Sequence, residues 1–181
     1  AGTGDITGAT PRPDTVFGDV AVAVNPKTTP RRGLRGREVL IPVINRHIQI
    51  IADDDVDTSF GSGALKITPA HDPVDFEIAQ RHSLPLVNIF NKDATLNKHA
   101  GPYEGFDRFD CRKDLLVRLE KDGLLVKVEP HAHAVGHCMR CGTVIEPWAS
   151  YQWFVKAKPL AEPAIEAVKS GQITIIPDQF Q

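Results

Sequence analysis

The sequence has few cysteines and few aromatic residues, and it lacks long hydrophobic runs. Only three of its 181 residues are cysteine, so we expect no disulfide framework and a reducing compartment such as the cytoplasm. No apolar run approaches the roughly 20 residues that span a bilayer, and a membrane protein is therefore not expected. The first residues show neither the basic nor the apolar region of a secretory signal, which also favours the cytoplasm.

A strong net charge is also lacking. The formal net charge is −2, with 41% hydrophobic and 24% charged residues, a balance typical of a globular domain with a real core. A nucleic acid would therefore have to be held by a local basic patch. The loop at 27–37 offers such a patch, because it contains Arg31, Arg32 and Arg35. We predict phosphate contacts there if RNA binds, and a solvated loop is the alternative.

Local patterns predict an α/β (α+β) fold, with a mixed, curled sheet or a small β-barrel as its core and peripheral helices. Short β-prone runs predict strands at 20–24, 39–41, 48–51, 64–67, 86–90 and 124–128. Helices are expected from Asp72 onward, at 108–122 before Gly123, and at 160–170 before Gly171. These elements do not alternate regularly, which argues against a doubly wound parallel sheet.

Polar groups of both signs are dense between residues 66 and 77, at the junction of a predicted strand and a predicted helix. Lys66 and Thr68 alternate along the strand and so project from one face. Asp72 is a favoured N-cap, and Asp75 follows three residues later, a spacing typical of a helix cap. The cap interpretation accounts well for Asp72. Because Asp75 shares a face with apolar residues of the helix, we predict that it points inward, where a carboxylate could bind an ammonium or position a water.

A second polar loop surrounds Arg12. Two prolines fix the backbone on either side of this residue, whose guanidinium could bind a phosphate or a carboxylate. An exposed turn is the alternative for this loop. The histidine of the first polar segment, His71, is as compatible with an ordinary loop position as with a site.

Cys138 and Cys141 form a Cys-x-x-Cys knuckle. Two thiolates at this spacing chelate zinc well, but a structural zinc site usually needs four ligands. The missing ligands could come from His131, His133 and His137, or from chain outside this sequence. A redox dithiol is less favoured, because no thioredoxin-like β-α-β pattern surrounds the pair.

These motifs resemble the editing domain of the valyl-tRNA synthetases, a large insertion in the catalytic domain of those enzymes. Residues 61–77 carry the most specific part of the resemblance, with Lys-Ile-Thr-Pro-Ala-His-Asp-Pro at 66–73. The loop and strand at 12–26 and the knuckle region at 136–155 extend it. Two residues depart from the pattern: Pro11 stands where the family has a threonine, and Asp14 has the character of the leucyl relatives.

The resemblance implies hydrolysis of mischarged threonyl-tRNA(Val) by a positioned water. Asp75 would anchor the substrate ammonium, and Arg12 would hold the terminal adenosine or the ester carbonyl. The residues with implied catalytic roles are Asp75, Asp72, Lys66 and Thr68. The residues with implied substrate-binding roles are Arg12, Thr15, Thr10 and His71.

The resemblance also implies partners, cofactors and domains. The expected partners are the 3′ end of tRNA(Val) charged with threonine and the rest of a synthetase chain, and a monomer is expected. Editing would need no cofactor, Cys138 and Cys141 would be half of a structural zinc site, and ATP would serve only a full-length synthetase. We predict an added or disordered start at 1–9, an editing domain at 10–146 and an exit segment at 147–181. The alternatives are a leucyl-type editing domain and a non-catalytic zinc-knuckle module that binds tRNA.

Overall fold

The computed structural model describes residues 4–27, 33–58 and 62–180. It comprises two compact units, of which the first ends at Ala149 and the second is Ser150–Gln181. The first unit thus extends slightly beyond residue 146, where the editing domain was predicted to end. Among the described residues, no helix is long and apolar enough to cross a membrane.

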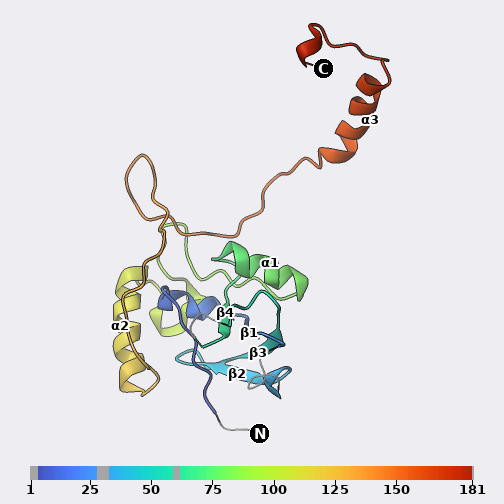
Figure 1. Ribbon diagram of the computed structural model, residues 1–181. Coiled ribbons are helices and arrows are strands. Elements are labelled where there is room, and N and C mark those ends of the chain that lie inside the picture. Colours follow the sequence, from blue (N-terminus) through green and yellow to red (C-terminus); the bar gives the residue numbers. More distant parts are fainter. Residues whose placement is uncertain (1–3, 28–32, 59–61, 181) are drawn as a thin grey trace. The chain divides into compact units, whose positions relative to one another are not determined.

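The core of the first unit is a four-stranded mixed sheet with the order β2-β3-β1-β4 (Figure 1). β1 is parallel to β3 and antiparallel to β4, and β2 is antiparallel to β3. The strands are β1 (Ala21–Val24), β2 (Glu38–Ile41), β3 (Arg46–Ala52) and β4 (Ala64–Ile67). The predicted mixed sheet is therefore confirmed. Of the two predicted cores, a curled sheet or a small β-barrel, these strands form the sheet.

β1 lies inside the sheet because its sequence has no polar face. Ala21, Ala23 and Val24 are buried, and an apolar run of this kind is typical of a strand that is covered on both sides. Its pairing with β4 places Val22 opposite Lys66 and Ala21 opposite Ile67. This register fixes where the polar end of β4 leaves the sheet.

Three α-helices form where the sequence predicted them. α1 (Pro73–Arg81) packs against β4, and α2 (Arg108–Lys121) packs against the short 3-10 helix η1 (Pro13–Gly18). Figure 1 shows α1 above the sheet and α2 to one side of it. α3 (Lys158–Lys169) belongs to the second unit, and a further 3-10 helix, η3 (Lys98–Tyr103), precedes α2.

Two predicted strands are wrong. Residues 86–90 are irregular because side chains form hydrogen bonds with main-chain groups that a strand would need for pairing. The N–H of Ile89 donates to His71 Nε2 at 3.0 Å. The carbonyl oxygen of Asn88 accepts from Asn97 Nδ2 at 2.9 Å. Residues 124–128 are not part of the sheet and lie on the surface, with Val126 71% exposed. A β-prone run without a neighbouring strand leaves its main-chain groups to water.

η1 is held to η3 by a ring contact and to α2 by an ion pair whose carboxylate is buried. Phe17 stacks on Tyr103 with ring centroids 5.4 Å apart. Asp14, which is fully buried, accepts a hydrogen bond from Arg112 Nε at 2.9 Å. The packing of α2 therefore determines the position of the loop that precedes η1.

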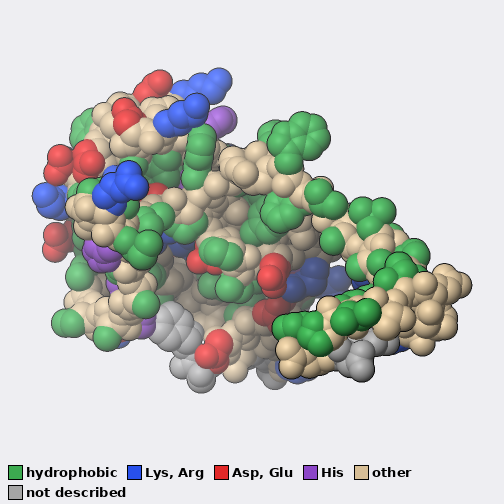
Figure 2. All heavy atoms as spheres, turned by 90° about the horizontal axis from the view of Figure 1, so that it is seen from above, with side chains coloured by type: hydrophobic (Ala, Val, Ile, Leu, Met, Phe, Trp, Pro, Cys, Tyr) green, Lys and Arg blue, Asp and Glu red, His purple; other side chains and the backbone are tan. Residues whose placement is uncertain are grey.

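The surfaces of the two units differ. α2 carries exposed ion pairs between Lys113 and Asp110 and between Arg118 and Asp122, and Figure 2 shows acidic and basic side chains on the left of its view. In the second unit no residue of α3 is buried, and Leu160 and Ile165 are 70% and 51% exposed.

The buried face of α2 is the basis of a stability prediction. Leu115 is fully buried whereas Val117, on the same helix, is 66% exposed. We expect Leu115→Ala to lower the free energy of unfolding by about 2–5 kcal/mol, because it leaves a cavity in the core. The control Val117→Ala should change it by no more than about 0.5 kcal/mol. Urea unfolding followed by circular dichroism measures both, and equal effects would contradict the packing described for α2.

Candidate functional site

The structure joins all the predicted catalytic and substrate-binding residues in one hydrogen-bonded group, together with Asp19. Its members come from η1 and the residues that flank it, from the end of β4 and from the start of α1. We call this group the polar cluster: Thr10, Arg12, Thr15, Asp19, Lys66, Thr68, His71, Asp72 and Asp75. Segments far apart in the sequence thus meet at the strand-to-helix junction that the sequence singled out.

The ammonium of Lys66 lies at the centre of the polar cluster and donates to two threonine hydroxyls. One is Thr15 Oγ1, at 3.0 Å, and the other is Thr68 Oγ1. An ammonium can only donate, so each hydroxyl must direct its own proton elsewhere. The Thr15 hydroxyl donates to the Arg12 carbonyl oxygen at 2.9 Å, and the Thr68 hydroxyl donates to the Asp19 carboxylate. Both hydroxyl protons are therefore committed, and neither threonine is a free nucleophile.

Asp19 is the acceptor at the end of this hydrogen-bond chain, and sequence reasoning did not select it as a site residue. It is 3% exposed, and its Oδ1 lies 3.5 Å from Lys66 Nζ. Burial raises the pKa of Asp19, although Lys66 and the Thr68 hydroxyl oppose the shift. The preceding Gly18 was a usable signal: a Cβ there would lie 3.0 Å from Thr68 Cγ2, so a glycine marks the close approach of the two segments.

Asp75 points inward, as predicted. It is 6% exposed, and its Oδ2 accepts a hydrogen bond from the main-chain N–H of Thr68 at 2.8 Å. Its Oδ1 accepts no hydrogen bond from any residue that the structure describes. Burial raises the pKa of Asp75 to about 6, while the Thr68 N–H and the charge of Lys66 oppose this rise. The result is a buried carboxylate that is fixed at one oxygen and open at the other.

Asp72 is the N-cap of α1, which confirms the helix-cap interpretation. Its Oδ1 accepts hydrogen bonds from Val74 N at 2.8 Å and from Asp75 N at 3.1 Å. The side chain is exposed, and within the described chain Oδ2 has no hydrogen-bond donor. The cap fixes the first turn of α1 and thereby the position of Asp75.

Arg12 is held at both ends of its guanidinium. Nη1 donates to the His71 carbonyl oxygen at 3.1 Å, and Nη2 forms an ion pair with Glu146. The Arg12 side chain nevertheless remains 24% exposed. Thr10, which is exposed, accepts the Arg12 main-chain N–H at 3.1 Å and so shapes the backbone before η1.

His71 has no ring nitrogen free for a substrate. The residue is 1% exposed, and its Nε2 accepts the N–H of Ile89 at 3.0 Å. Nδ1 must then carry the proton, which it donates to the Pro147 carbonyl oxygen at 3.0 Å. Burial lowers the pKa of His71 to about 4, so the ring is neutral at physiological pH and links three segments of backbone.

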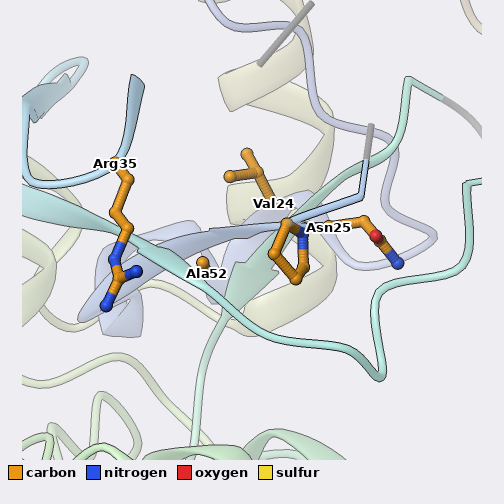
Figure 3. A pocket seen from close by; sticks show the side chains of 5 residues that line it. Val24, Asn25, Arg35 and Ala52 are labelled. Atoms are coloured by element: carbon orange, nitrogen blue, oxygen red, sulfur yellow. The ribbon is translucent and has the colours of Figure 1, made fainter. Parts of the chain in front are cut away.

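Arg35 is separate from the polar cluster. It lines a small cavity of about 130 Å³ with Val24, Asn25, Pro26 and Ala52. Figure 3 shows the Arg35 side chain on one side of this cavity and Asn25 on the other. Arg31 and Arg32, also predicted as tRNA contacts, lie outside the described residues.

A larger cavity of about 320 Å³ lies between the loop at 90–94 and the segment at 143–148. Its wall contains Arg108 and Glu146, which form an ion pair with Nε and Oε1 2.9 Å apart. Because Glu146 also binds Arg12, this carboxylate connects the cavity with the polar cluster.

The two cysteines of the knuckle provide two possible metal ligands. Cys138 and Cys141 lie in a tight turn in which Gly142 N donates to the Cys138 carbonyl oxygen at 2.9 Å. Hydrogen bonds with Thr143 lower the pKa of Cys141, which favours its thiolate. Among the described residues, no group of three or more His, Cys, Asp or Glu is placed to hold a metal. In the described part of the chain, the nearby histidines are therefore not placed to complete a zinc site with this pair.

The raised pKa of Asp75 generates a prediction about titration and stability. We expect the Asp75 carboxyl carbon to titrate with a midpoint near pH 6 in ¹³C NMR. The folded state then holds a proton that the unfolded chain, with an ordinary pKa of 3.8, releases at lower pH. Stability should therefore fall as the pH rises from about 4 to 6, and Asp75→Asn should remove this part of the decline. A midpoint near 4 would contradict the burial of this carboxylate.

Comparisons with known proteins agree with this architecture. A family model described as the leucyl-tRNA synthetase editing domain matches residues 22–105. The crystal structure of GlLeuRS-CP1 is similar to this chain with a TM-score of 0.52 and 14% sequence identity. The match covers 67% of this chain and 83% of that chain, and it supports the fold.

Two valine–tRNA ligases are much more similar in sequence. The ligase of Dehalococcoides mccartyi is 53% identical over 99% of this chain and 20% of its own length, and that of Carboxydothermus hydrogenoformans is 54% identical over the same shares. The chain thus spans about a fifth of the length of these relatives. We conclude that the chain is homologous to a segment of the valyl-tRNA synthetases and that its residues 22–105 are homologous to the leucyl-tRNA synthetase editing domain.

Proposed function

We propose that this chain hydrolyses the ester bond of mischarged threonyl-tRNA(Val) after transfer of the amino acid. Threonine and valine have nearly the same shape, and a hydrophobic pocket cannot strongly reject a substrate that merely adds a hydroxyl. A second site that binds the hydroxyl by hydrogen bonds can discriminate, because valine would leave its polar groups unpaired. The geometry of Asp75 is the observation that carries this proposal.

Asp75 binds the α-ammonium of the aminoacyl ester through Oδ1. Since Thr68 N holds Oδ2 at 2.8 Å, the open oxygen has a fixed direction before substrate arrives. An ammonium at hydrogen-bond distance favours the ionised carboxylate and opposes the effect of burial on its pKa. The ester carbonyl carbon, one bond from the α-carbon, is then placed relative to the rest of the polar cluster.

Water is the nucleophile of the proposed reaction. The hydroxyls of Thr15 and Thr68 have their protons committed to Arg12 and Asp19, so an acyl-enzyme on either is disfavoured. The water oxygen bonds to the ester carbon, the ester C–O bond breaks, and a proton passes to the departing ribose oxygen. The vicinal ribose hydroxyl assists this proton transfer. Orientation and charge placement supply the acceleration.

The other members of the polar cluster bind or position the substrate. Arg12, at 24% exposure, holds the terminal adenosine or the ester carbonyl. Lys66, whose three N–H groups are taken by Thr15, Thr68 and Asp19, contributes its charge. The open Oδ2 of Asp72 binds the threonine hydroxyl or the attacking water. Thr10, Thr15 and His71 act through the backbone that they fix rather than by direct contact.

The partner of this reaction is the charged 3′ end of tRNA(Val), and the reaction itself needs no cofactor. The chain is part of a longer synthetase, which acts as a monomer in the cytoplasm. ATP serves only the synthetic site of that synthetase. Cys138 and Cys141 contribute half of a structural zinc site whose second half lies outside this chain.

A leucyl-type editing specificity is the second candidate. The match of residues 22–105 to the leucyl-tRNA synthetase editing model favours it. The identity of more than half of the residues to valine–tRNA ligases favours the valyl type instead. Norvalyl-charged leucine tRNA separates the two, and a non-catalytic tRNA-binding module would release neither amino acid.

The proposal predicts a specific loss on changing Asp75. Under single-turnover conditions, with excess chain, we expect release of threonine from threonyl-tRNA(Val) and little release from valyl-tRNA(Val). Asp75→Asn keeps the shape of the side chain but removes the charge that binds the ammonium. It should slow threonine release by about 10²-fold or more, as loss of a single preorganised electrostatic contact does.

Glu77→Gln is the matched control, because Glu77 is an exposed carboxylate two residues further along the same helix. We expect this variant to keep wild-type activity. Unchanged threonine release by Asp75→Asn, with an intact fold by circular dichroism, would overturn the assignment of Asp75. No release by the wild-type chain at saturating concentration would overturn the hydrolytic function itself.

A further inference from the structure

Glu146 bridges two arginines that lie far apart in the sequence. Its Oε2 pairs with Arg12 Nη2 in the loop before η1, and its Oε1 lies 2.9 Å from Arg108 Nε at the start of α2. The Glu146 side chain is 10% exposed and that of Arg108 is 8% exposed. Two guanidinium groups thus hold one largely buried carboxylate from both sides.

The segment that carries Glu146 is anchored to other parts of the first unit on both sides of this residue. Arg108 Nη2 donates to the Val144 carbonyl oxygen at 3.4 Å, and the Pro147 carbonyl oxygen accepts from His71 Nδ1 at 3.0 Å. Ala149 N then donates to the Ala70 carbonyl oxygen at 3.1 Å. The position of Glu146 is thus fixed by backbone contacts that do not involve Arg12.

The contacts of Arg12 leave part of its guanidinium for a ligand. One N–H donates to the His71 carbonyl oxygen and another to Glu146. Arginine has five N–H donors in a rigid plane, and no described residue accepts from the other three in the structure. Two bonds at the ends of the plane therefore orient the remaining donors, which 24% exposure leaves accessible.

We propose that Glu146 is a positioning residue that fixes the guanidinium of Arg12 for the aminoacyl-tRNA end, with Arg108 as its support. The proposal rests on the proposed hydrolytic function, since it assigns a role in binding the substrate of that site. It extends the site to residues 144–149, which lie beyond the part matched by the editing-domain model. Free rotation of Arg12 would cost binding energy when the substrate has to immobilise it.

The first test measures the orientation of Arg12 without any reaction. Side-chain ¹⁵N NMR of the 181-residue chain should show resolved, slowly rotating Nη signals for Arg12. Glu146→Ala should average these signals, and Glu146→Gln, which keeps one hydrogen-bond acceptor, should give an intermediate state. Glu129→Ala is the control, because Glu129 is an exposed carboxylate that pairs with Lys127. Arg12 signals that are equally resolved in Glu146→Ala would overturn the proposal that Glu146 positions the Arg12 guanidinium.

The second test measures substrate binding by the same variants. We expect Glu146→Ala to raise the half-saturating concentration in single-turnover hydrolysis of threonyl-tRNA(Val) about tenfold, with the maximal rate within about twofold, as loss of one charged contact implies. Glu146→Gln should recover part of this loss, and it serves as the folded variant if Glu146→Ala does not fold.

A double variant separates positioning from a general effect on the fold. If Glu146 acts through Arg12, Arg12→Ala combined with Glu146→Gln should bind no worse than Arg12→Ala alone. Fully additive losses, or an unchanged half-saturating concentration in Glu146→Gln and Glu146→Ala, would overturn the positioning role. If the wild-type chain releases no amino acid, the proposed function fails, while the NMR result still decides whether Glu146 holds Arg12.

Discussion

The hydrogen bond from Thr68 N to the Asp75 carboxylate is the contact on which the site depends. It joins the end of β4 to the first turn of α1 at 2.8 Å. An unpaired buried carboxylate would be costly, so burial of Asp75 requires this donor and the nearby ammonium of Lys66. The same contact fixes the one oxygen and leaves the other open. The burial of Asp75 and its proposed binding of the substrate ammonium therefore both depend on this hydrogen bond.

The polar cluster balances two opposing effects. Burial raises the pKa values of Asp19 and Asp75 and so disfavours the ionised form of both carboxylates. The positive charge of Lys66 opposes the rise in pKa of both carboxylates. Its ammonium donates to the hydroxyls of Thr15 and Thr68, and the Thr68 hydroxyl donates in turn to Asp19. A substrate ammonium adds a second positive charge near Asp75. The cluster is thus better paired electrostatically with a cationic amino acid ester than without it.

Much of the site could be predicted from the sequence by local rules, whereas its long-range contacts could not. Asp72 before Pro73 predicted the start of α1, and the apolar face of that helix predicted that Asp75 points inward. Nothing local indicated that Glu146 would meet Arg12, 134 positions away. The run at 86–90 has the composition of a strand, but His71 takes the Ile89 N–H that pairing would need. Such contacts are decided by the packed fold rather than by propensity.

The proposed function depends on recognition of the α-ammonium of the bound amino acid by Asp75. The most direct measurement compares the affinity of two non-hydrolysable threonyl-adenosine analogues, one with the α-amino group and one with a hydroxyl in its place. The wild-type chain should prefer the amino analogue by about tenfold or more, as a buried charged hydrogen bond implies. Asp75→Asn should lose this preference. An equal preference in both proteins would contradict this role of Asp75.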